Sequence, residues 1–379
     1  MEFSLTETQQ LIRDTARQFA DEKVAPGTID RDEREEFPAA IVRELGELGF
    51  MGMMVPEEWG GAGLDTMSYV LAMEEISRVD ASVGVIMSVN NSLVCYGLNK
   101  DGSTDQKERY LRDLASGRKL GAFALSEPEA GSDASNQRTI AVRDGDAYVL
   151  NGTKNWITNG STADLVLVMA ATDKAKGAKG ISTFIVEKGT PGFTVAKKER
   201  KLGIRSSDTV SLSFTDCRVP AANMIGEEGS GFKFAMKTLE GGRIGIAAQA
   251  LGIGQGCLDA SVRYAKERKA FDRPIAELQA IQFKIADMAT NLDAARMLIY
   301  KAASLKDSGA PFGQDAAMAK LFASKVAVGA ALEAIQIHGG YGYVREYLVE
   351  RYLRDAKVTE IYEGTSEIQR IVIARSLLK

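Results

Sequence analysis

The period of the hydrophobic pattern changes twice along this chain, and that change restricts the possible folds more than any other feature. Apolar residues recur at spacings of three and four, as in amphipathic helices, up to about residue 120. Short apolar runs and alternation replace this spacing from about 121 to 226, and the helical spacing returns from about 232 to 378. Helices, then strands, then helices predict a mostly α-helical protein with a central β domain. The lack of βαβ alternation argues against a doubly wound nucleotide-binding fold.

The first region, residues 1–120, predicts an N-terminal helical domain. Its segments 37–48 and 69–79 have the apolar spacing of helices, and a loop marked by Gly and Pro at 56–63 separates them. Two capping boxes, each a Thr or Ser followed three residues later by Gln, mark expected helix starts: Thr6 with Gln9, and Ser103 with Gln106.

The second region, residues 121–228, predicts an antiparallel, barrel-like β domain. Its runs at 165–169 and 181–186 are short and apolar, and apolar residues alternate with polar neighbours at 210–214. The Asp-Gly pair at 144–145 lies between two strand-like runs, which indicates a hairpin turn. Strands of this length without long helices between them favour antiparallel pairing.

The third region, residues 229–379, predicts a C-terminal four-helix bundle. Its segments 232–267, 278–306 and 314–337 are long, rich in Ala and Gly, and joined by short loops, which is typical of antiparallel helices. The chain has no GxGxxG fingerprint and no Walker A loop. Alternate glycines at 252–256 come closest, but they lie inside a helical run and do not follow a strand. A dinucleotide, if bound, is therefore held in another way.

Composition and charge exclude several classes of function. The formal net charge of −4 argues against a nucleic-acid partner. The single histidine, His338, and three cysteines without zinc or CxxC spacing argue against a metal site. The N-terminus lacks the basic and apolar segments of a signal peptide, and charged residues interrupt the most apolar C-terminal run, 316–337. We therefore expect a soluble cytoplasmic protein without a metal and without a membrane-spanning segment.

Two motifs in the β region could contact a flat aromatic ligand. Residues 123–133, FALSEPEAGSD, carry backbone N–H groups and hydroxyls that could hold a ring and phosphates, although composition alone favours an ordinary strand-to-loop turn. Residues 156–160, WITNG, place a Trp beside a hydroxyl residue, which suits stacking on a ring with one hydrogen bond to its edge. A Trp packed in the core of a strand is the equally compatible alternative.

Two glycine-rich motifs lie in the helical C-terminal region. Residues 239–243, LEGGR, place two glycines in a helical run at a cost in stability, which a close ligand or a close helix would explain. Arg243 could then reach the nucleotide part of a ligand. Residues 336–342, QIHGGYG, end a helix and expose backbone N–H groups that suit an anion such as pyrophosphate. A simple helix C-cap is the alternative there.

Glu363 is the candidate general base. Because the chain has one histidine, a base is expected to be a carboxylate with a raised pKa. Glu363 lies beside Gly364 at an expected loop-to-helix junction, and the apolar Ile361 and Tyr362 are expected to desolvate it and raise its pKa. The helix expected to begin near Thr365 presents backbone N–H groups that favour a negatively charged ligand.

Taken together, these motifs resemble the acyl-CoA dehydrogenase family over essentially the whole chain. Residues 354–369, RDAKVTEIYEGTSEIQ, are similar to the family's C-terminal signature. FALSEPEAGSD and WITNG are similar to its flavin-domain motifs, in the same order and with the same spacing. Within the family, residues 84–93 and 201–205 most resemble the short-chain, butyryl-CoA branch. The resemblance implies a three-domain fold and FAD-dependent α,β-dehydrogenation of a short-chain acyl-CoA to its trans-2-enoyl-CoA.

The resemblance also implies the site residues. Glu363 would take the α-proton while the β-carbon gives a hydride to flavin N5. The residues implied to contact FAD are Phe123, Leu125, Ser126, Gly131, Ser132, Trp156, Ile157, Thr158, Phe271, Thr365 and Glu367. Those implied to reach FAD from a neighbouring subunit are Arg268, Gln279, Gln336, Ile337, Gly339 and Gly340. The residues implied to contact the substrate are Ser132, Glu240, Arg243 and Gly364.

The family places its base at one of two positions, and only one of them carries an ionisable side chain here. The other position, used in the isovaleryl and long-chain branches, corresponds to Gly242. The resemblance therefore implies Glu363 as the base. Glu240 departs from the Asp that short-chain relatives usually carry, and this departure concerns the CoA contact only.

Several alternatives stay open at the level of sequence. An acyl-CoA oxidase of the same fold is compatible with the motifs, as is a dehydrogenase of medium or branched chains. A flavin monooxygenase of the same fold would not need Glu363 as a base. A non-enzymatic helical scaffold would not need the flavin motifs. The resemblance further implies a homotetramer built as a dimer of dimers, electron transfer flavoprotein as the electron acceptor, and a role in fatty acid β-oxidation or butyrate metabolism.

Overall fold

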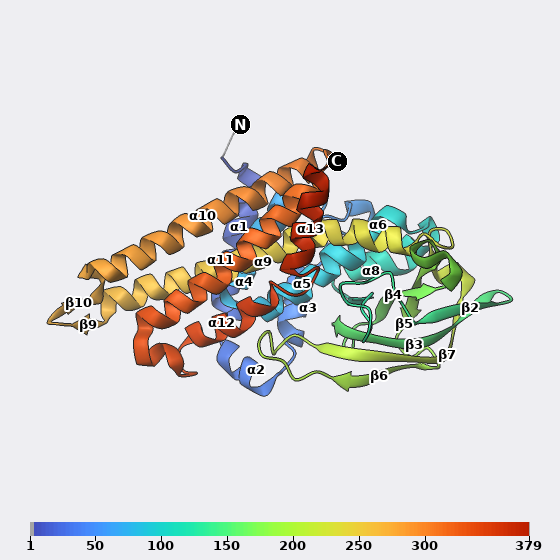
Figure 1. The fold of residues 1–379 in the computed structure, drawn as a ribbon, viewed down its shortest axis with the longest axis horizontal. Coiled ribbons are helices and arrows are strands. Elements are labelled where there is room, and N and C mark those ends of the chain that lie inside the picture. The colour runs from blue at the N-terminus through green and yellow to red at the C-terminus, as the bar shows by residue number, and fades with distance from the viewer. Residues whose placement is uncertain (1–3, 379) are drawn as a thin grey trace.

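Helices form the first part of the chain, as the apolar spacing predicts (Figure 1). The structure is a computed structural model and describes residues 4–378. Both predicted capping boxes are present, because Thr6 and Ser103 each accept a hydrogen bond from the backbone N–H three residues later. The elements of this part are α1 (Glu7–Phe19), η1 (Ala20–Val24), α2 (Thr28–Arg34), α3 (Ala39–Glu47), η2 (Glu57–Trp59), α4 (Thr66–Val79), α5 (Ala81–Ser88), η3 (Val89–Cys95), α6 (Tyr96–Asp101), α7 (Thr104–Gln106), η4 (Lys107–Leu111) and α8 (Arg112–Ala115).

One continuous helical run, Ala81–Asp101, lies at the centre of this part and comprises α5, the π-helical η3 and α6. By length and composition it could cross a membrane, but 94% of its most apolar window is buried inside the molecule. It packs against α9 of the C-terminal region and against the first strand of the sheet. The run therefore has the position of a core helix.

The middle of the chain forms one eight-stranded sheet (Figure 1). Its strands are β1 (Gly121–Ala124), β2 (Ile140–Asp144), β3 (Ala147–Thr158), β4 (Leu165–Ala171), β5 (Ile181–Glu187), β6 (Phe193–Lys198), β7 (Thr209–Pro220) and β8 (Met224–Ile225). Pairing is antiparallel along most of the order β6-β7-β3-β2-β4-β5-β8. β1 pairs with β4 in parallel, and β2 touches β4 through one parallel pair. The predicted Asp-Gly hairpin joins β2 to β3, and within the described residues the sheet ends do not pair, so the barrel-like sheet stays open.

The last part of the chain is the helical bundle that the long Ala- and Gly-rich segments predict. Its elements are α9 (Gly231–Glu267), β9 (Lys269–Ala270), β10 (Arg273–Pro274), η7 (Ile275–Glu277), α10 (Gln279–Asp307), α11 (Gly313–His338), η8 (Gly339–Tyr343), α12 (Leu348–Val358) and α13 (Ser366–Leu377). Close packing explains two of the alternate glycines of α9. A Cβ atom at Gly252 would lie 2.3 Å from the Glu74 carbonyl oxygen, and one at Gly256 would lie 2.4 Å from that of Arg78.

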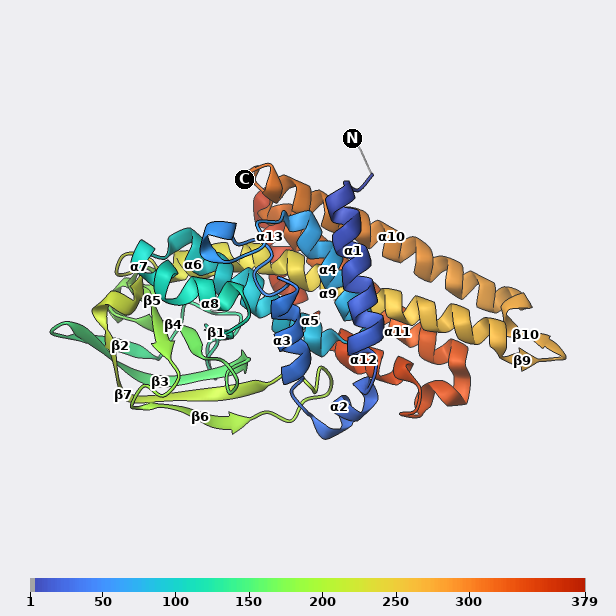
Figure 2. The ribbon, with the colours of Figure 1, turned by 180° about the vertical axis from the view of Figure 1, so that it is seen from behind.

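The sheet lies toward one end of the molecule, and the long helices α9, α10 and α11 extend toward the other end, where the β9–β10 hairpin is the tip (Figure 1). Seen from behind, α1 and α4 cover the bundle (Figure 2). One hydrophobic core joins the N-terminal helices to the bundle, and a second core lies within the sheet. The first core also contains Phe123 and Leu125 of the sheet region, and Tyr362 in the loop before α13 packs against it.

Candidate active site

Glu363 lies in the turn between α12 and α13, as the sequence predicts. Its backbone φ is +51°, a left-handed conformation that is uncommon for a non-glycine residue, and Gly364 follows with φ +95°. Thr365 caps α13, because its Oγ1 accepts a hydrogen bond from the Ile368 backbone N–H at 3.4 Å. Left-handed residues outside glycine are concentrated at functional sites, where the surrounding structure must hold them.

The Glu363 carboxylate faces Gly242, the second glycine of the pair in α9, whereas Gly241 faces Lys306. A Cβ atom at Gly242 would lie 2.2 Å from Glu363 Oε2 and 2.9 Å from Leu93 Cδ2. No real Cβ contact is that short, so position 242 has no room for a side chain while Glu363 holds this conformation. The cost of a glycine within a helix is therefore explained by the close approach of the carboxylate. The two positions at which the family can carry a base lie against each other in space.

The surroundings of Glu363 favour its protonated form. Oε2 is buried and has no hydrogen-bond partner among residues 4–378. Burial raises the pKa of Glu363 to about 7, against the opposing effect of the positive charges of Lys320 and Arg243. The expectation that Ile361 helps to desolvate the carboxylate is wrong, because Ile361 is 53% exposed. Gly242 and Leu93 enclose it instead, and Tyr362 points inward to donate a hydrogen bond to the Gln249 amide oxygen.

Two buried cations lie close enough to Glu363 to affect its charge. Arg243 on α9 is buried, its Nε has no hydrogen-bond partner in the described chain, and burial lowers its pKa. Lys320 on α11 is fully buried, and its ammonium donates a hydrogen bond to the Gly364 carbonyl at 2.8 Å. Burial lowers the pKa of Lys320 to about 8. A carboxylate, a guanidinium and an ammonium with unused hydrogen-bonding capacity are suited to a polar ligand between them.

The loop that carries FALSEPEAGSD begins at β1 and is fixed by a buried ion pair. Lys154 on β3 donates to Glu127 Oε1 at 2.7 Å and to the Leu125 carbonyl at 3.1 Å. Both charged side chains are almost completely buried. Within the loop, Phe123 and Leu125 are buried, whereas Gly131 and Ser132 are exposed.

Trp156 is not a core residue, which decides between the two interpretations of WITNG. Its ring is 61% exposed, and its φ is +64° at an irregularity of β3 between Lys154 and Ile157. Bulges of this kind turn a side chain away from the regular pattern of a strand. Ile157 is buried and Thr158 is partly exposed at the end of the same strand. An aromatic face and a hydroxyl are therefore both available to a ligand.

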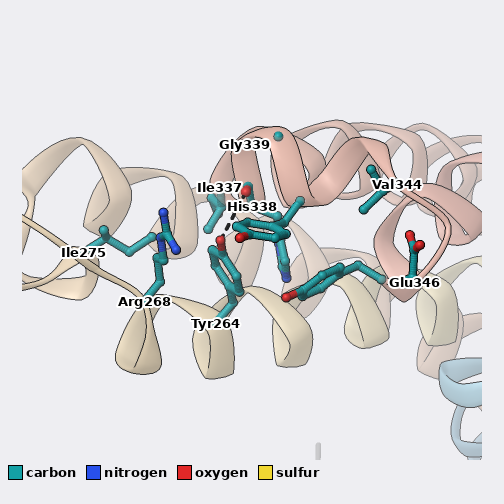
Figure 3. A pocket seen from close by; sticks show the side chains of 11 residues that line it. Tyr264, Arg268, Ile275, Ile337, His338, Gly339, Val344 and Glu346 are labelled. Atoms are coloured by element: carbon teal, nitrogen blue, oxygen red, sulfur yellow. Dashed lines mark hydrogen bonds between the residues drawn. The ribbon is translucent and has the colours of Figure 1, made fainter.

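A second set of predicted residues lines a pocket of about 800 Å³ at the far end of the bundle (Figure 3). Arg268, Ile337, Gly339 and Gly340 line it, together with His338. The His338 ring stacks on Tyr264 with centroids 4.2 Å apart, its Nδ1 lies 2.8 Å from the Ala334 carbonyl, and burial lowers its pKa. Positions 339 and 340 are open, since a Cβ atom at either would meet nothing within 4 Å. The predicted residues that do not line this pocket, although they belong to the same end of the molecule, are Phe271, Gln279 and Gln336.

The two sets of predicted residues do not meet within one chain. Gly242 and Arg268 are separated by the length of α9, roughly 40 Å at 1.5 Å per helical residue. Phe271 is at the tip of the β9–β10 hairpin and is 84% exposed. The remaining predicted residues lie at the Glu363 end: Glu240, Thr365 and Gly364 are partly exposed, and Glu367 is exposed on α13.

Family comparisons match all three parts of the chain. The acyl-CoA dehydrogenase N-terminal domain matches residues 6–118, the middle domain matches 122–217 and the C-terminal domain matches 229–378. The chain belongs to the acyl-CoA dehydrogenase family. It is 55% identical over 375 residues to the mitochondrial short-chain specific acyl-CoA dehydrogenase of Mus musculus, covering 99% of this chain and 91% of that protein.

Solved structures of this family match the whole fold. Butyryl-CoA dehydrogenase from Megasphaera elsdenii is 50% identical, with a TM-score of 0.99 and complete coverage of both chains. A chain in a structure described as "Electron transferring flavoprotein of Acidaminococcus fermentans: Towards a mechanism of flavin-based electron bifurcation" is 52% identical, with a TM-score of 0.99 and complete coverage. Among residues 4–378, no cluster of three or more His, Cys, Asp or Glu side chains could hold a metal ion.

Sequence reasoning missed several residues that surround Glu363. The sequence indicates Lys320 only as one of the charges that interrupt the apolar run 316–337, and Leu93 only as the last residue of the segment 84–93 that resembles the short-chain branch. A buried lysine in an Ala-rich helix is itself a signal, because lysine is almost never fully buried without a partner. The ion pair of Glu127 and Lys154 joins the FALSEPEAGSD loop to β3, the strand in which WITNG begins, but a separation of 27 residues gives no local pattern to detect it.

Proposed function

We propose that this protein is an FAD-dependent dehydrogenase of short-chain acyl-CoA thioesters and that Glu363 removes the α-proton. The observation that carries the proposal is the Glu363 carboxylate, which is enclosed by Gly242 and Leu93 and whose Oε2 has no hydrogen-bond partner among the described residues. A base works best when its pKa is near the operating pH, and the pKa of about 7 meets this condition. The relatives named short-chain specific and butyryl-CoA dehydrogenase support the choice of substrate class.

The residues at the Glu363 end fit the ring part of FAD. The exposed Trp156 ring offers an aromatic face, and Thr158 on the same strand offers a hydroxyl. The open Gly131 and the exposed Ser132 leave room for a ligand beside them. Thr365 and the first backbone N–H groups of α13 suit a polar or negatively charged part of the cofactor. FAD, when bound, would accept the hydride that leaves the β-carbon.

The chain's own residues account for the proton transfer. Glu363 holds its carboxylate in a buried position, where the lower dielectric constant strengthens electrostatic interactions. Its raised pKa makes it a stronger base than an exposed glutamate. The buried positive charge of Arg243 is placed to attract a substrate that becomes negative as the proton leaves. Glu240, one turn before Arg243 on α9, is assigned to the CoA portion together with Ser132 and Gly364.

We assign the far pocket to the phosphate and adenine end of an FAD molecule held mainly by a second chain. Arg268 supplies a positive charge there, and Gly339 and Gly340 leave their backbones open to an anion. The roughly 40 Å along α9 between this pocket and Glu363 supports an arrangement in which two chains contribute to each flavin site. Exposed apolar side chains on the bundle, including Phe271, Phe283 and Leu332, support a homotetramer built as a dimer of dimers. A monomer in light scattering that still retains FAD would contradict this assembly.

The electron acceptor is proposed to be an electron transfer flavoprotein. The support is the 52% identical chain in a structure described as an electron transferring flavoprotein. A cytoplasmic location is proposed from the sequence, whereas the mouse relative is named as mitochondrial. An oxygen electrode tests the acceptor, because an oxidase of this fold would consume oxygen during turnover and a dehydrogenase would not.

Anaerobic visible spectroscopy tests the function directly. The purified protein is expected to be yellow, and its flavin band is expected to bleach when butyryl-CoA is added. Octanoyl-CoA and isovaleryl-CoA, added in the same way, are expected to bleach it more slowly. A yellow protein that no acyl-CoA bleaches would contradict the substrate class. A colourless protein that takes up no added FAD would contradict the whole proposal.

A further inference from the structure

Lys320 is a fully buried ammonium to which the proposed reaction gives no role. It lies on α11, far from α13 in sequence, and its side chain has no exposed surface. Its recorded partner among residues 4–378 is the Gly364 carbonyl, at 2.8 Å. Taking an ammonium out of water costs several kcal/mol unless a partner compensates. One carbonyl uses only one of its three donors, so a purely structural role does not explain the residue.

The Gly364 carbonyl is held from two sides. Lys320 donates to it from α11, and the Gln369 amide donates to it from α13, both at 2.8 Å. The same Gln369 amide lies 3.3 Å from the Glu363 carbonyl. A carbonyl oxygen has two lone pairs, and Gly364 therefore has both of them occupied. The bonds to Gly364 fix the peptide group between Gly364 and Thr365, and the Gln369 bond reaches the preceding one, in a turn where Glu363 and Gly364 both have positive φ.

The charge of Lys320 acts mainly on Glu363. Among the charged groups that affect Lys320, Glu363 is the largest favourable one, ahead of Glu360 and Glu367. Conversely, Lys320 is the larger of the two positive charges that lower the pKa of Glu363, ahead of Arg243 on α9. The ammonium is hydrogen-bonded to the carbonyl of Gly364, the residue that directly follows Glu363. Burial disfavours the charged form of Glu363, and the charge of Lys320 opposes this effect.

Apart from Lys320 and Arg243, the groups that face Glu363 carry no positive charge. Tyr69 on α4 is fully buried, and burial raises its pKa, so it is neutral across the working range. Burial likewise raises the pKa of Tyr362, the residue next to Glu363. Leu93 from η3 is apolar, and Gln369 from α13 carries no charge. Of the described residues around the carboxylate, this leaves Lys320 and Arg243 as the cations.

We propose that Lys320 and Gln369 are positioning residues for Glu363: both hold its turn through the Gly364 carbonyl, and Lys320 alone adds a charge that keeps part of the carboxylate ionised. The proposal rests on the proposed function of Glu363 as the base. It separates a geometric contribution, which both residues make, from an electrostatic one, which only Lys320 makes. The two contributions change different quantities, namely the maximal rate and the pH at which half of that rate is reached.

The test uses the full-length protein with FAD bound and three variants. Lys320→Gln keeps a donor but removes the charge, so the midpoint of the pH–rate profile for flavin bleaching by butyryl-CoA is expected to rise by about one pH unit. Gln369→Leu removes a donor but no charge, so the maximal rate is expected to fall about tenfold at an unchanged midpoint. Lys320→Arg keeps a charge and a donor, and it is expected to restore the wild-type midpoint.

A second measurement follows Glu363 without turnover. The infrared band of its protonated carboxyl group, identified by its loss in Glu363→Gln, is titrated in the resting holoenzyme. In Lys320→Gln this titration is expected to shift upward by the same amount as the rate profile. An unchanged titration in Lys320→Gln, or a rate within about twofold of wild type in Gln369→Leu, would overturn the proposal. If wild-type protein is not bleached by any acyl-CoA, the proposed function fails instead, and the infrared titration still decides whether Lys320 acts on Glu363.

Discussion

Two buried glutamates of this protein each lie near a buried lysine, yet their surroundings are opposite. Glu127, in the loop after β1, accepts hydrogen bonds from Lys154 at 2.7 Å and from the backbone N–H groups of Arg138 and Thr139 at 2.6 and 3.1 Å. Burial by itself raises the pKa of Glu127, but these partners outweigh it and the net shift is downward. Glu363 has a buried oxygen without a partner in the described chain, and burial raises its pKa to about 7.

The lysines differ in the same way. Lys154 uses all three of its donors, on Glu127, on the Leu125 carbonyl at 3.1 Å and on the Gln137 amide oxygen at 3.2 Å. Within the part of the chain that the structure describes, Lys320 donates to one acceptor, the Gly364 carbonyl. A buried ionic network in which every group is satisfied stabilises one conformation, whereas an unsatisfied one retains capacity for another molecule. The same two residue types therefore build a fixed loop at one place and a reactive group at the other.

The largest expected effect comes from removing the reactive carboxylate. Glu363→Gln keeps the size and much of the shape of the side chain but cannot accept a proton at neutral pH. Turnover of butyryl-CoA is expected to fall by a factor of about 100 or more, the usual contribution of a general base, while FAD and acyl-CoA binding are retained. Steady-state rates and a ligand titration measure the two quantities. The matched control is Glu360→Gln, three residues earlier, which is expected to stay close to wild type. Activity above a few per cent in Glu363→Gln would remove Glu363 as the base.

The next effect concerns stability at the satisfied site. Lys154→Met leaves the Glu127 charge buried with backbone donors only, and breaking a buried pair in this way is expected to cost about 3 kcal/mol in the free energy of unfolding. Lys197→Met is the matched control, because Lys197 pairs with Glu199 while remaining 67% exposed. Such a surface pair contributes less than about 1 kcal/mol. Urea unfolding of both variants, at a fixed FAD concentration, gives the comparison. Equal losses in the two variants would show that burial does not distinguish these ion pairs.

The sequence predicted those features that depend on neighbours along the chain. The capping boxes at Thr6 and Ser103, the hairpin between β2 and β3 and the junction before α13 are all local, and the structure confirms them. The order of helical and strand regions follows from local periodicity for the same reason. Glu363 could be selected because its motif contains the residue, its glycine and the start of its helix within five positions.

Features that depend on distant segments could not be predicted. The parallel pairing of β1 with β4 joins strands that are 44 residues apart in register, and no pattern within either strand specifies it. Lys320 and Gly364 are likewise 44 residues apart, and only the packing of α11 against the turn brings them together. The exposure of Trp156 depends on an irregular pairing between β3 and β7, so the sequence left its core and ligand-facing interpretations equally open.

The smallest expected effect is a pH-dependent gain of stability at the reactive site. The pKa of Glu363 is about 7 in the folded protein and near its ordinary 4.5 in the unfolded chain, so the folded state disfavours its ionisation. The stability contributed by this group is fully present below pH 4.5 and is lost as the pH rises through 7. Glutamine does not titrate, and Glu363→Gln is therefore expected to be more stable than wild type at pH 8, by on the order of 1 kcal/mol, and equally stable near pH 4.5.

The matched comparison is Glu127→Gln, which is expected to be less stable than wild type at pH 8, because it removes a charged partner from a satisfied network. Thermal unfolding of wild type and the two variants at pH 4.5 and pH 8 measures these differences. A Glu363→Gln variant that is less stable than wild type at pH 8 would show that Glu363, like Glu127, stabilises the fold in its charged form.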